Sequence, residues 1–309
     1  MLLRRAALPS WRPLCCATLR LGVRCATATG PPSPVNVETF TLNEDVVKKD
    51  MEALQRWNDL SQTIDASRMG KRYDEVVAAV EKGLEMLGEM GALNAPIQCE
   101  TLLLLEAAQA HYNMQQFAPA LAKAEKAKNS LLTAPPALRD AAQLAEVNQL
   151  IAYIHLESGR AEKANDVFTE VLRWIDVDAK SAMPMQAVAA VNMRRSIVTG
   201  IGLCYHRLAE KDVASGGDGK DMYGKALDLL IEALNIHIDE NDFNSVKSTL
   251  SSVLKCFEGV GDAAQAVSTG EKYVSWCRRH NDEEGAAQGA AWLRELHEKY
   301  PTAANTTTK

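Results

Sequence analysis

The chain has 309 residues and a formal net charge of −6, with 47% hydrophobic and 24% charged residues. This balance is typical of a folded chain with a real core, and it excludes an intrinsically disordered protein. No run of 18 uncharged apolar residues occurs, so we expect no transmembrane span.

The first thirty residues differ in kind from the rest. They contain five arginines and no acidic residue, and the first carboxylate in the chain is Glu38. Arginine with leucine, serine and alanine but without acid is typical of a mitochondrial presequence. We therefore predict a presequence over residues 1–30 and a flexible leader over 31–42. An ordinary basic tail, on an adaptor that works outside mitochondria, is the alternative.

Removal of residues 1–30 would change the net charge from −6 to −11. A chain of that charge lacks the basic stripe that phosphate contacts need, so no nucleic-acid partner is expected.

Residues 43–300 are rich in Ala, Leu, Glu and Lys, which predicts helices throughout. Self-comparison finds a repeated unit in residues 108–127, 152–171 and 254–273, in which a turn precedes an alanine. Residues 73–86 match its second half, and 200–208 with 225–236 form a split copy. The small residues predicted at helix crossings are Ala108, Ala120, Ala152, Gly159, Ala164, Gly202, Ala226, Gly261 and Ala266.

This pattern resembles the tetratricopeptide repeat (TPR) family, in which small residues lie where two antiparallel helices touch. Equivalent positions lie 44, 44, 62 and 40 residues apart, whereas the standard period is 34. The pattern is therefore similar to the long-repeat, kinesin-light-chain-like variety. The resemblance implies an all-α, right-handed α-solenoid of about five antiparallel helix pairs.

The predicted solenoid ends in a capping helix near residues 283–300, with Trp292 and Leu296 on one face. Residues 301–309 are expected to form a disordered tail. Residues 209–224 interrupt the split unit, and their Gly, Asp, Ser and Lys content predicts an inserted solvated loop.

Gly219, Gly224 and Lys225 in that stretch have the spacing of a phosphate-binding loop. Ala226 stands where Ser or Thr would hold Mg²⁺, and no strand is evident before the loop. We therefore expect no nucleotide site and no small-molecule substrate.

Other chemistry is equally weakly supported. Cys277 and His280 have a C-x-x-H spacing, but no second ligand pair accompanies them. The cysteines are scattered, which indicates reduced thiols rather than a disulfide framework. No nucleophile–histidine–acid signature is visible. We expect no metal, no cofactor and no catalytic activity.

The expected function is a non-catalytic mitochondrial scaffold in the matrix or on the matrix face of the inner membrane. It would be an accessory subunit or assembly factor of a large complex such as a respiratory enzyme, with protein partners. A mitochondrial RNA-metabolism or ribosome-associated factor is the alternative. Family positions on the first helices predict a partner-binding groove that includes Gln109, Tyr112, Gln149, Tyr153, Thr199, His206 and Lys255.

Overall fold

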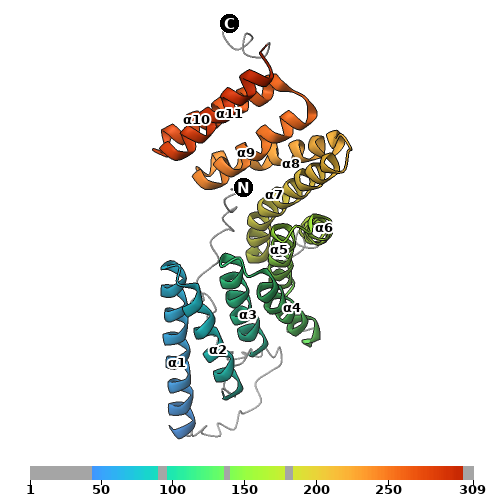
Figure 1. Cartoon of the computed structure of the whole chain (residues 1–309). Coiled ribbons are helices and arrows are strands. Elements are labelled where there is room, and N and C mark those ends of the chain that lie inside the picture. The colour runs from blue at the N-terminus through green and yellow to red at the C-terminus, as the bar shows by residue number, and fades with distance from the viewer. Residues whose placement is uncertain (1–43, 90–95, 136–139, 178–183, 302–309) are drawn as a thin grey trace, which may run out of the picture. The chain divides into compact units, whose positions relative to one another are not determined.

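The computed structural model describes residues 44–89, 96–135, 140–177 and 184–301. The predicted presequence and leader, and the tail from residue 302, lie outside these residues. Two compact units divide the chain between residues 140 and 141. Among the described residues there are eleven helices and no strand (Figure 1).

The first unit contains two antiparallel helix pairs. They are α1 (Glu44–Met69) with α2 (Tyr73–Glu89), and α3 (Pro96–Asn113) with α4 (Phe117–Thr133). Its core joins α1, α2 and α3 through Trp57, Ile64, Val80 and Leu103, which are all buried. Pro96 begins α3, where the missing N–H costs no hydrogen bond.

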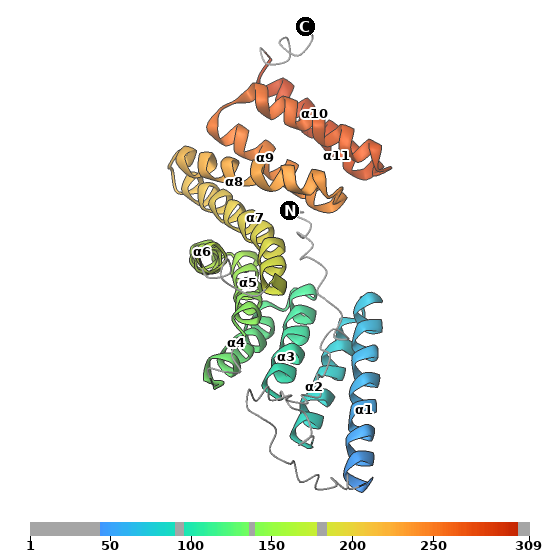
Figure 2. The same ribbon diagram turned by 180° about the vertical axis from the view of Figure 1, so that it is seen from behind.

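The second unit contains seven helices, of which six form three pairs. The pairs are α5 (Ala141–Glu157) with α6 (Ala161–Val177), α7 (Pro184–Ala214) with α8 (Lys220–Asp239), and α9 (Phe243–Val260) with α10 (Ala263–Arg279). α11 (Glu283–Lys299) follows and packs on α10. Each helix packs on the next, and α7 also contacts α5 and α9, so the first helices of the three pairs are neighbours in succession (Figure 2).

The predicted fold class is confirmed, with five antiparallel helix pairs and a further terminal helix among the described residues. Trp292 of α11 lies against Tyr273 with a ring-centroid separation of 5.1 Å, and Leu296 is 3% exposed. Both therefore face the stack, as expected of a closing helix. No helix among the described residues has the length and apolar character needed to cross a bilayer.

The turns between helices share one hydrogen-bond pattern. After α5, the N–H of Arg160 donates to the carbonyl of His155, and after α9 the N–H of Asp262 donates to that of Phe257. This is the Schellman closure, which satisfies carbonyls at the end of a helix. The residue before each donor has a positive φ: Gly159 at 78° and Gly261 at 90°.

Gly159 and Gly261 were expected at close helix crossings, and this prediction is wrong. Nothing lies within 4 Å of a Cβ built on either residue, because both sit in turns that need a left-handed backbone. Gly202 does lie at a crossing, where a Cβ would be 2.9 Å from the side chain of Leu230. The predicted crossing alanines are all fully buried: Ala108, Ala120, Ala152, Ala164, Ala226 and Ala266.

The inserted loop predicted over residues 209–224 is also wrong. α7 continues to Ala214 and α8 begins at Lys220, so residues 215–219 alone connect them. The C-terminal part of α7 is helical because one face of it packs on α8: Ala209 is fully buried and lies in one apolar cluster with Tyr223 of α8. The extra length of this pair lies in longer helices rather than in a loop.

The stretch with the spacing of a phosphate-binding loop is mostly part of helix α8. Gly224 and Lys225 lie within α8, and the Lys225 ammonium is 2.7 Å from the carboxylate of Asp221 one turn earlier. A helix cannot offer the row of main-chain N–H groups that wraps a phosphate, because those groups bond within the helix.

Gly224→Ala should raise the free energy of unfolding by about 0.5–1 kcal/mol, because alanine is the better helix former. No atom outside its own helix lies within 4 Å of a Cβ at this position, so nothing opposes the gain. Urea denaturation measures the change. A loss of stability would mean that residue 224 lies outside a helix or against another element.

Candidate functional site

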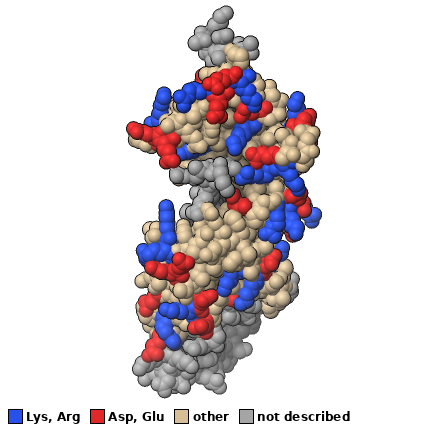
Figure 3. Space-filling view, viewed as in Figure 1, with Lys and Arg blue, Asp and Glu red and all other residues tan. Residues whose placement is uncertain are grey.

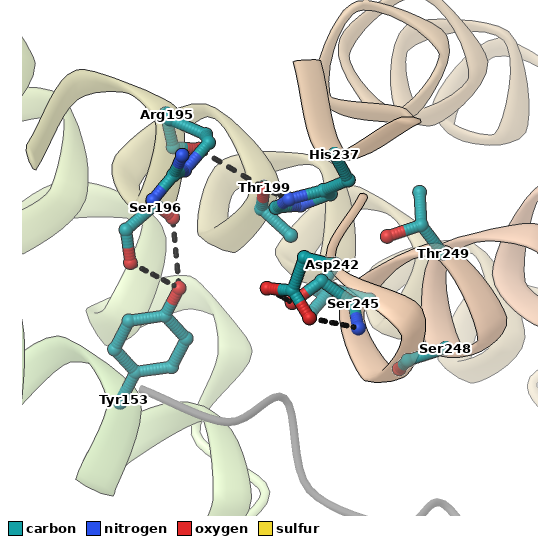
Figure 4. Close-up of a pocket in the computed structure, with 10 residues that line it drawn as sticks. Tyr153, Arg195, Ser196, Thr199, His237, Asp242, Ser245, Ser248 and Thr249 are labelled. Carbon is teal, nitrogen blue, oxygen red and sulfur yellow. Dashed lines mark hydrogen bonds between the residues drawn. The ribbon is translucent and has the colours of Figure 1, made fainter. Parts of the chain in front are cut away.

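A small pocket opens in the second unit where α5, α7, α8 and α9 meet (Figure 4). Its open volume is about 40 Å³. Hydroxyl groups dominate its wall, together with one arginine, one histidine and one aspartate. The lining residues are Tyr153, Arg195, Ser196, Thr199, Leu203, His237, Asp242, Ser245, Ser248 and Thr249.

Helical spacing explains why these residues face one pocket. The α7 residues Arg195, Thr199 and Leu203 follow one another at four-residue steps, which places them on one face of a helix. Ser245 and Thr249 on α9 have the same spacing.

One wall is a closed hydrogen-bond network between α5 and α7. The Tyr153 hydroxyl donates to the Ser196 carbonyl at 2.8 Å and lies 2.9 Å from the Ser196 hydroxyl, which accepts from the Gln149 amide at 2.8 Å. Burial raises the pKa of Tyr153 well above its usual range, so its proton stays in this network. This wall is structural and fixes α5 against α7.

The opposite wall is less completely satisfied. Thr199 donates its hydroxyl to the Arg195 carbonyl at 3.0 Å, and the Nε2 atom of His237 lies 3.4 Å from the same hydroxyl oxygen. The Nδ1 atom of His237 has no hydrogen-bond partner among the described residues.

The two charged side chains of this wall are held in different ways. The Arg195 guanidinium forms an ion pair with Glu240 at the end of α8. Asp242 caps the N-terminus of α9, accepting from the main-chain N–H of Ser245 at 3.2 Å and from its hydroxyl at 2.7 Å. Burial lowers the pKa of His237, and Arg195 adds to this effect while Asp242 opposes it, so the imidazole is neutral near neutral pH.

A second hollow, of about 280 Å³, lies between α9 and α11. Lys255, Glu258, Trp292 and Lys299 line it, and Lys299 pairs with Glu258 at 3.2 Å. Its floor is Leu254 and Leu296, which are buried between the two helices.

The residues predicted to line one groove are distributed differently. Tyr153 and Thr199 meet in the small pocket, Gln149 lies behind its wall, and Lys255 lines the second hollow. Gln109 and Tyr112 are buried in α3 of the other unit. In the second unit, Gln149 and His206 are buried between helices and do not line an open surface, whereas Tyr153, Thr199 and Lys255 do line one of the two hollows. That these three bind a partner stays a prediction.

His206 is the clearest correction. It is 2% exposed and lies edge-on to Tyr223 with a centroid separation of 5.9 Å, so it belongs to the core between α7 and α8. Burial lowers its pKa to about 4, although Glu210 nearby opposes the shift.

Stability should therefore fall in mild acid. The unfolded chain binds a proton on His206 below about pH 6.5, whereas the folded chain does so only near pH 4. The free energy of unfolding is therefore unaffected by His206 above about pH 6.5 and falls as the pH drops toward 4. The loss from this residue is about 2 kcal/mol at pH 5.

Urea denaturation between about pH 7.5 and pH 5 measures this loss. His206→Phe should reduce the pH dependence by most of that amount, and the exposed-site control His297→Asn should leave it in place. An unchanged pH dependence in His206→Phe would contradict the assignment.

Several residues of the pocket were missed by sequence reasoning. Arg195, His237 and Asp242 are not among the residues predicted to bind a partner, yet all three line the pocket. A signal was present, however: Asp242, Asp262 and Asp282 are 20 residues apart, and each caps a helix. Counting back 20 residues from Asp282 to Asp262, and again to Asp242, would have placed a turn before a helix at Asp242.

Reactive side chains elsewhere are buried or engaged. Cys99, Cys204, Cys256 and Cys277 are free and buried, and burial raises the pKa of each thiol. The Nδ1 atom of His280 lies 3.0 Å from the carbonyl oxygen of Trp276. No group of three or more metal-ligating side chains forms among the described residues.

No protein-family model and no curated protein matches the sequence. Solved structures do. Aspartyl phosphate phosphatase F from Bacillus subtilis is 13% identical over 85% of this chain and 61% of its own, with a TM-score of 0.53. A putative kinesin light chain with TPR-like repeats from Podosopora anserina is 13% identical over 72% of this chain and 96% of its own, with a TM-score of 0.47. BtubC from P. vanneervenii is 11% identical over 74% of this chain and 92% of its own, with a TM-score of 0.39.

Likeness at such low identity concerns the fold alone. The architecture of paired antiparallel helices, small residues at their crossings and neighbouring first helices agrees with it. By its fold, this chain is an all-α array of antiparallel helix pairs, similar to that of aspartyl phosphate phosphatase F.

Proposed function

We propose that the protein is a non-catalytic interaction scaffold of mitochondria, an accessory subunit or assembly factor of a large complex. The TPR-like fold suggests protein–protein interaction, although one fold can host many functions. The observation that carries the proposal is the small polar pocket among neighbouring first helices. It offers hydrogen bonds to a protruding side chain, but it is far below the roughly 300–1,000 Å³ of ordinary small-molecule sites.

The surface supports a protein partner rather than RNA. Figure 3 shows lysine and arginine mixed with aspartate and glutamate over the visible face. Arg194, for example, pairs with Glu232 at 2.6 Å and with Asp176 at 3.6 Å. Groups paired in this way do not form the continuous positive track that a phosphate backbone needs.

The mitochondrial part rests on residues 1–30, with their five arginines and no acid. Fusing these residues to a fluorescent protein should direct it to mitochondria. A variant with all five arginines changed to glutamine should remain outside. Equal distribution of the two fusions would overturn the location and favour an adaptor elsewhere in the cell.

Native-gel fractionation of mitochondria, with mass spectrometry across the lanes, tests the scaffold itself. Co-migration with a large complex supports an accessory subunit and names the partner. Co-migration with incomplete subcomplexes supports an assembly factor. Migration of the whole population near the chain's own mass would overturn the proposal.

A further inference from the structure

The pocket in the second unit contains a buried hydroxyl group that lacks a partner. Thr249 on α9 is 3% exposed and lines the pocket. Its hydroxyl forms no hydrogen bond with any described residue, and its oxygen keeps accessible surface, so it can be reached from the pocket. Figure 4 shows this oxygen turned toward the side of the pocket where His237 and Asp242 lie. A buried hydroxyl in this state indicates a place for a hydrogen-bonding group from outside.

The charges of the pocket argue for a cationic occupant. The Asp242 carboxylate accepts two hydrogen bonds from Ser245, but it forms no ion pair with any described residue. Arg195 on the same wall is already neutralised by Glu240. α8 ends and α9 begins at this turn, so the opposite partial charges of the two helix ends offset each other. The charge of Asp242 is therefore uncompensated, and a cation that enters gains a charge-assisted hydrogen bond.

The size of the pocket selects among cations. A volume of about 40 Å³ accommodates about three water-sized groups, at roughly 10–15 Å³ each. A lysine ammonium with its last methylene groups meets this limit, whereas the planar guanidinium of arginine is larger than the ammonium. The ammonium donors match the acceptors in the wall, which are the Asp242 carboxylate and the hydroxyls of Thr249 and Ser248. Ser248, like Thr249, forms no side-chain hydrogen bond with the described residues. Leu203 offers the methylene groups an apolar contact.

We infer that this pocket binds the side-chain ammonium of a lysine presented by the partner protein. The ammonium forms an ion pair with Asp242 and donates to the hydroxyl oxygens of Thr249 and Ser248 on α9. This inference rests on the proposed scaffold function and specifies which partner group the scaffold recognises.

The first test uses the full chain with isotope-labelled threonine methyl groups and n-propylammonium as the probe, at constant ionic strength. The probe should shift the NMR signal of the Thr249 methyl group with saturation, at a midpoint about tenfold lower than those of n-propanol and n-propylguanidinium. The methyl signal of Thr269, which is buried on α10 and does not line this pocket, should not move. An absent or non-saturating shift, or an equal midpoint for either of the other probes, would overturn the inference.

Two matched variants connect the pocket to the partner. Asp242→Asn removes the charge but keeps the cap of α9, because asparagine caps a helix as well as aspartate does. Asp262→Asn makes the same change at the cap of α10, on an exposed residue that does not line the pocket. Asp242→Asn should raise the n-propylammonium midpoint about tenfold and reduce the fraction that co-migrates with the complex, whereas Asp262→Asn should change neither. If the wild type and Asp242→Asn co-migrate equally, the pocket inference fails while the scaffold function stands. If the wild type itself does not co-migrate, the scaffold function fails.

Discussion

Gly200→Val lowers the free energy of unfolding by about 3 kcal/mol, at the upper end of overpacking effects. A Cβ at this α7 position would lie 2.5, 2.7 and 2.8 Å from three ring atoms of Phe168 on α6. Phe168 is fully buried and stacks edge-on against Tyr153 at a centroid separation of 4.9 Å. The ring therefore has no free space to move into, and α6 must move away from α7.

A double-mutant cycle identifies the cause. Phe168→Ala alone costs about 3–5 kcal/mol, because it leaves a cavity. Combined with Gly200→Val, it should cost less than the sum of the two changes by about 1–3 kcal/mol, since the valine occupies part of that cavity. Urea denaturation of the four proteins measures this coupling. Additive losses would contradict direct contact between residues 168 and 200.

The general fold was predictable because it depends on patterns that the sequence repeats. Ala120 and Ala164, 44 residues apart, mark the second helix of two successive pairs, and both are fully buried. Pro96 and Pro184 each begin a helix, at the position where proline is tolerated. Helical spacing and proline placement are local properties, which explains why they can be seen without the structure.

The glycines show where such reasoning stops. Gly159 and Gly261 matched the crossing positions of the repeat but serve turns with positive φ. Gly200 and Gly259 were not recognised, although a Cβ at Gly259 would lie 2.2 Å from the ring of Tyr223. Whether a glycine faces a neighbouring ring depends on how each helix is rotated in the stack, and the sequence spacing of a single helix does not determine that rotation.

The pocket was half predictable for the same reason. Tyr153 and Thr199 lie on first helices, where the family pattern places binding residues. His237 comes from a second helix and Asp242 from the turn that follows it, and they reach the pocket because α8 and α9 pack closely together. Side chains from such a junction are brought together by tertiary packing alone.

The second large effect concerns α11, the terminal helix. Leu296→Asp should detach this helix, because Leu296 is 3% exposed in a cluster with Leu254, Ala266 and Val267. Leu254, Ala266 and Val267 offer a carboxylate no hydrogen-bond donor, so it must leave these apolar contacts to reach the ammonium groups of Lys255 or Lys299 at the neighbouring hollow. Burying one without a partner costs several kcal/mol, which opposes the docking of α11.

Hydrogen exchange gives this prediction a local readout. In Leu296→Asp, amides of α11 should lose protection by about two or more orders of magnitude, at 1.4 kcal/mol per tenfold change, while α5 to α7 remain protected. His297→Asp places the same charge on an exposed neighbouring residue of the same helix and should have a far smaller effect. Because α11 covers Tyr273 and Val274 of α10, its loss also exposes an apolar surface, so the variant should self-associate in gel filtration. If α11 keeps its protection in Leu296→Asp, the helix is held by contacts other than this cluster and does not close the stack through its apolar face.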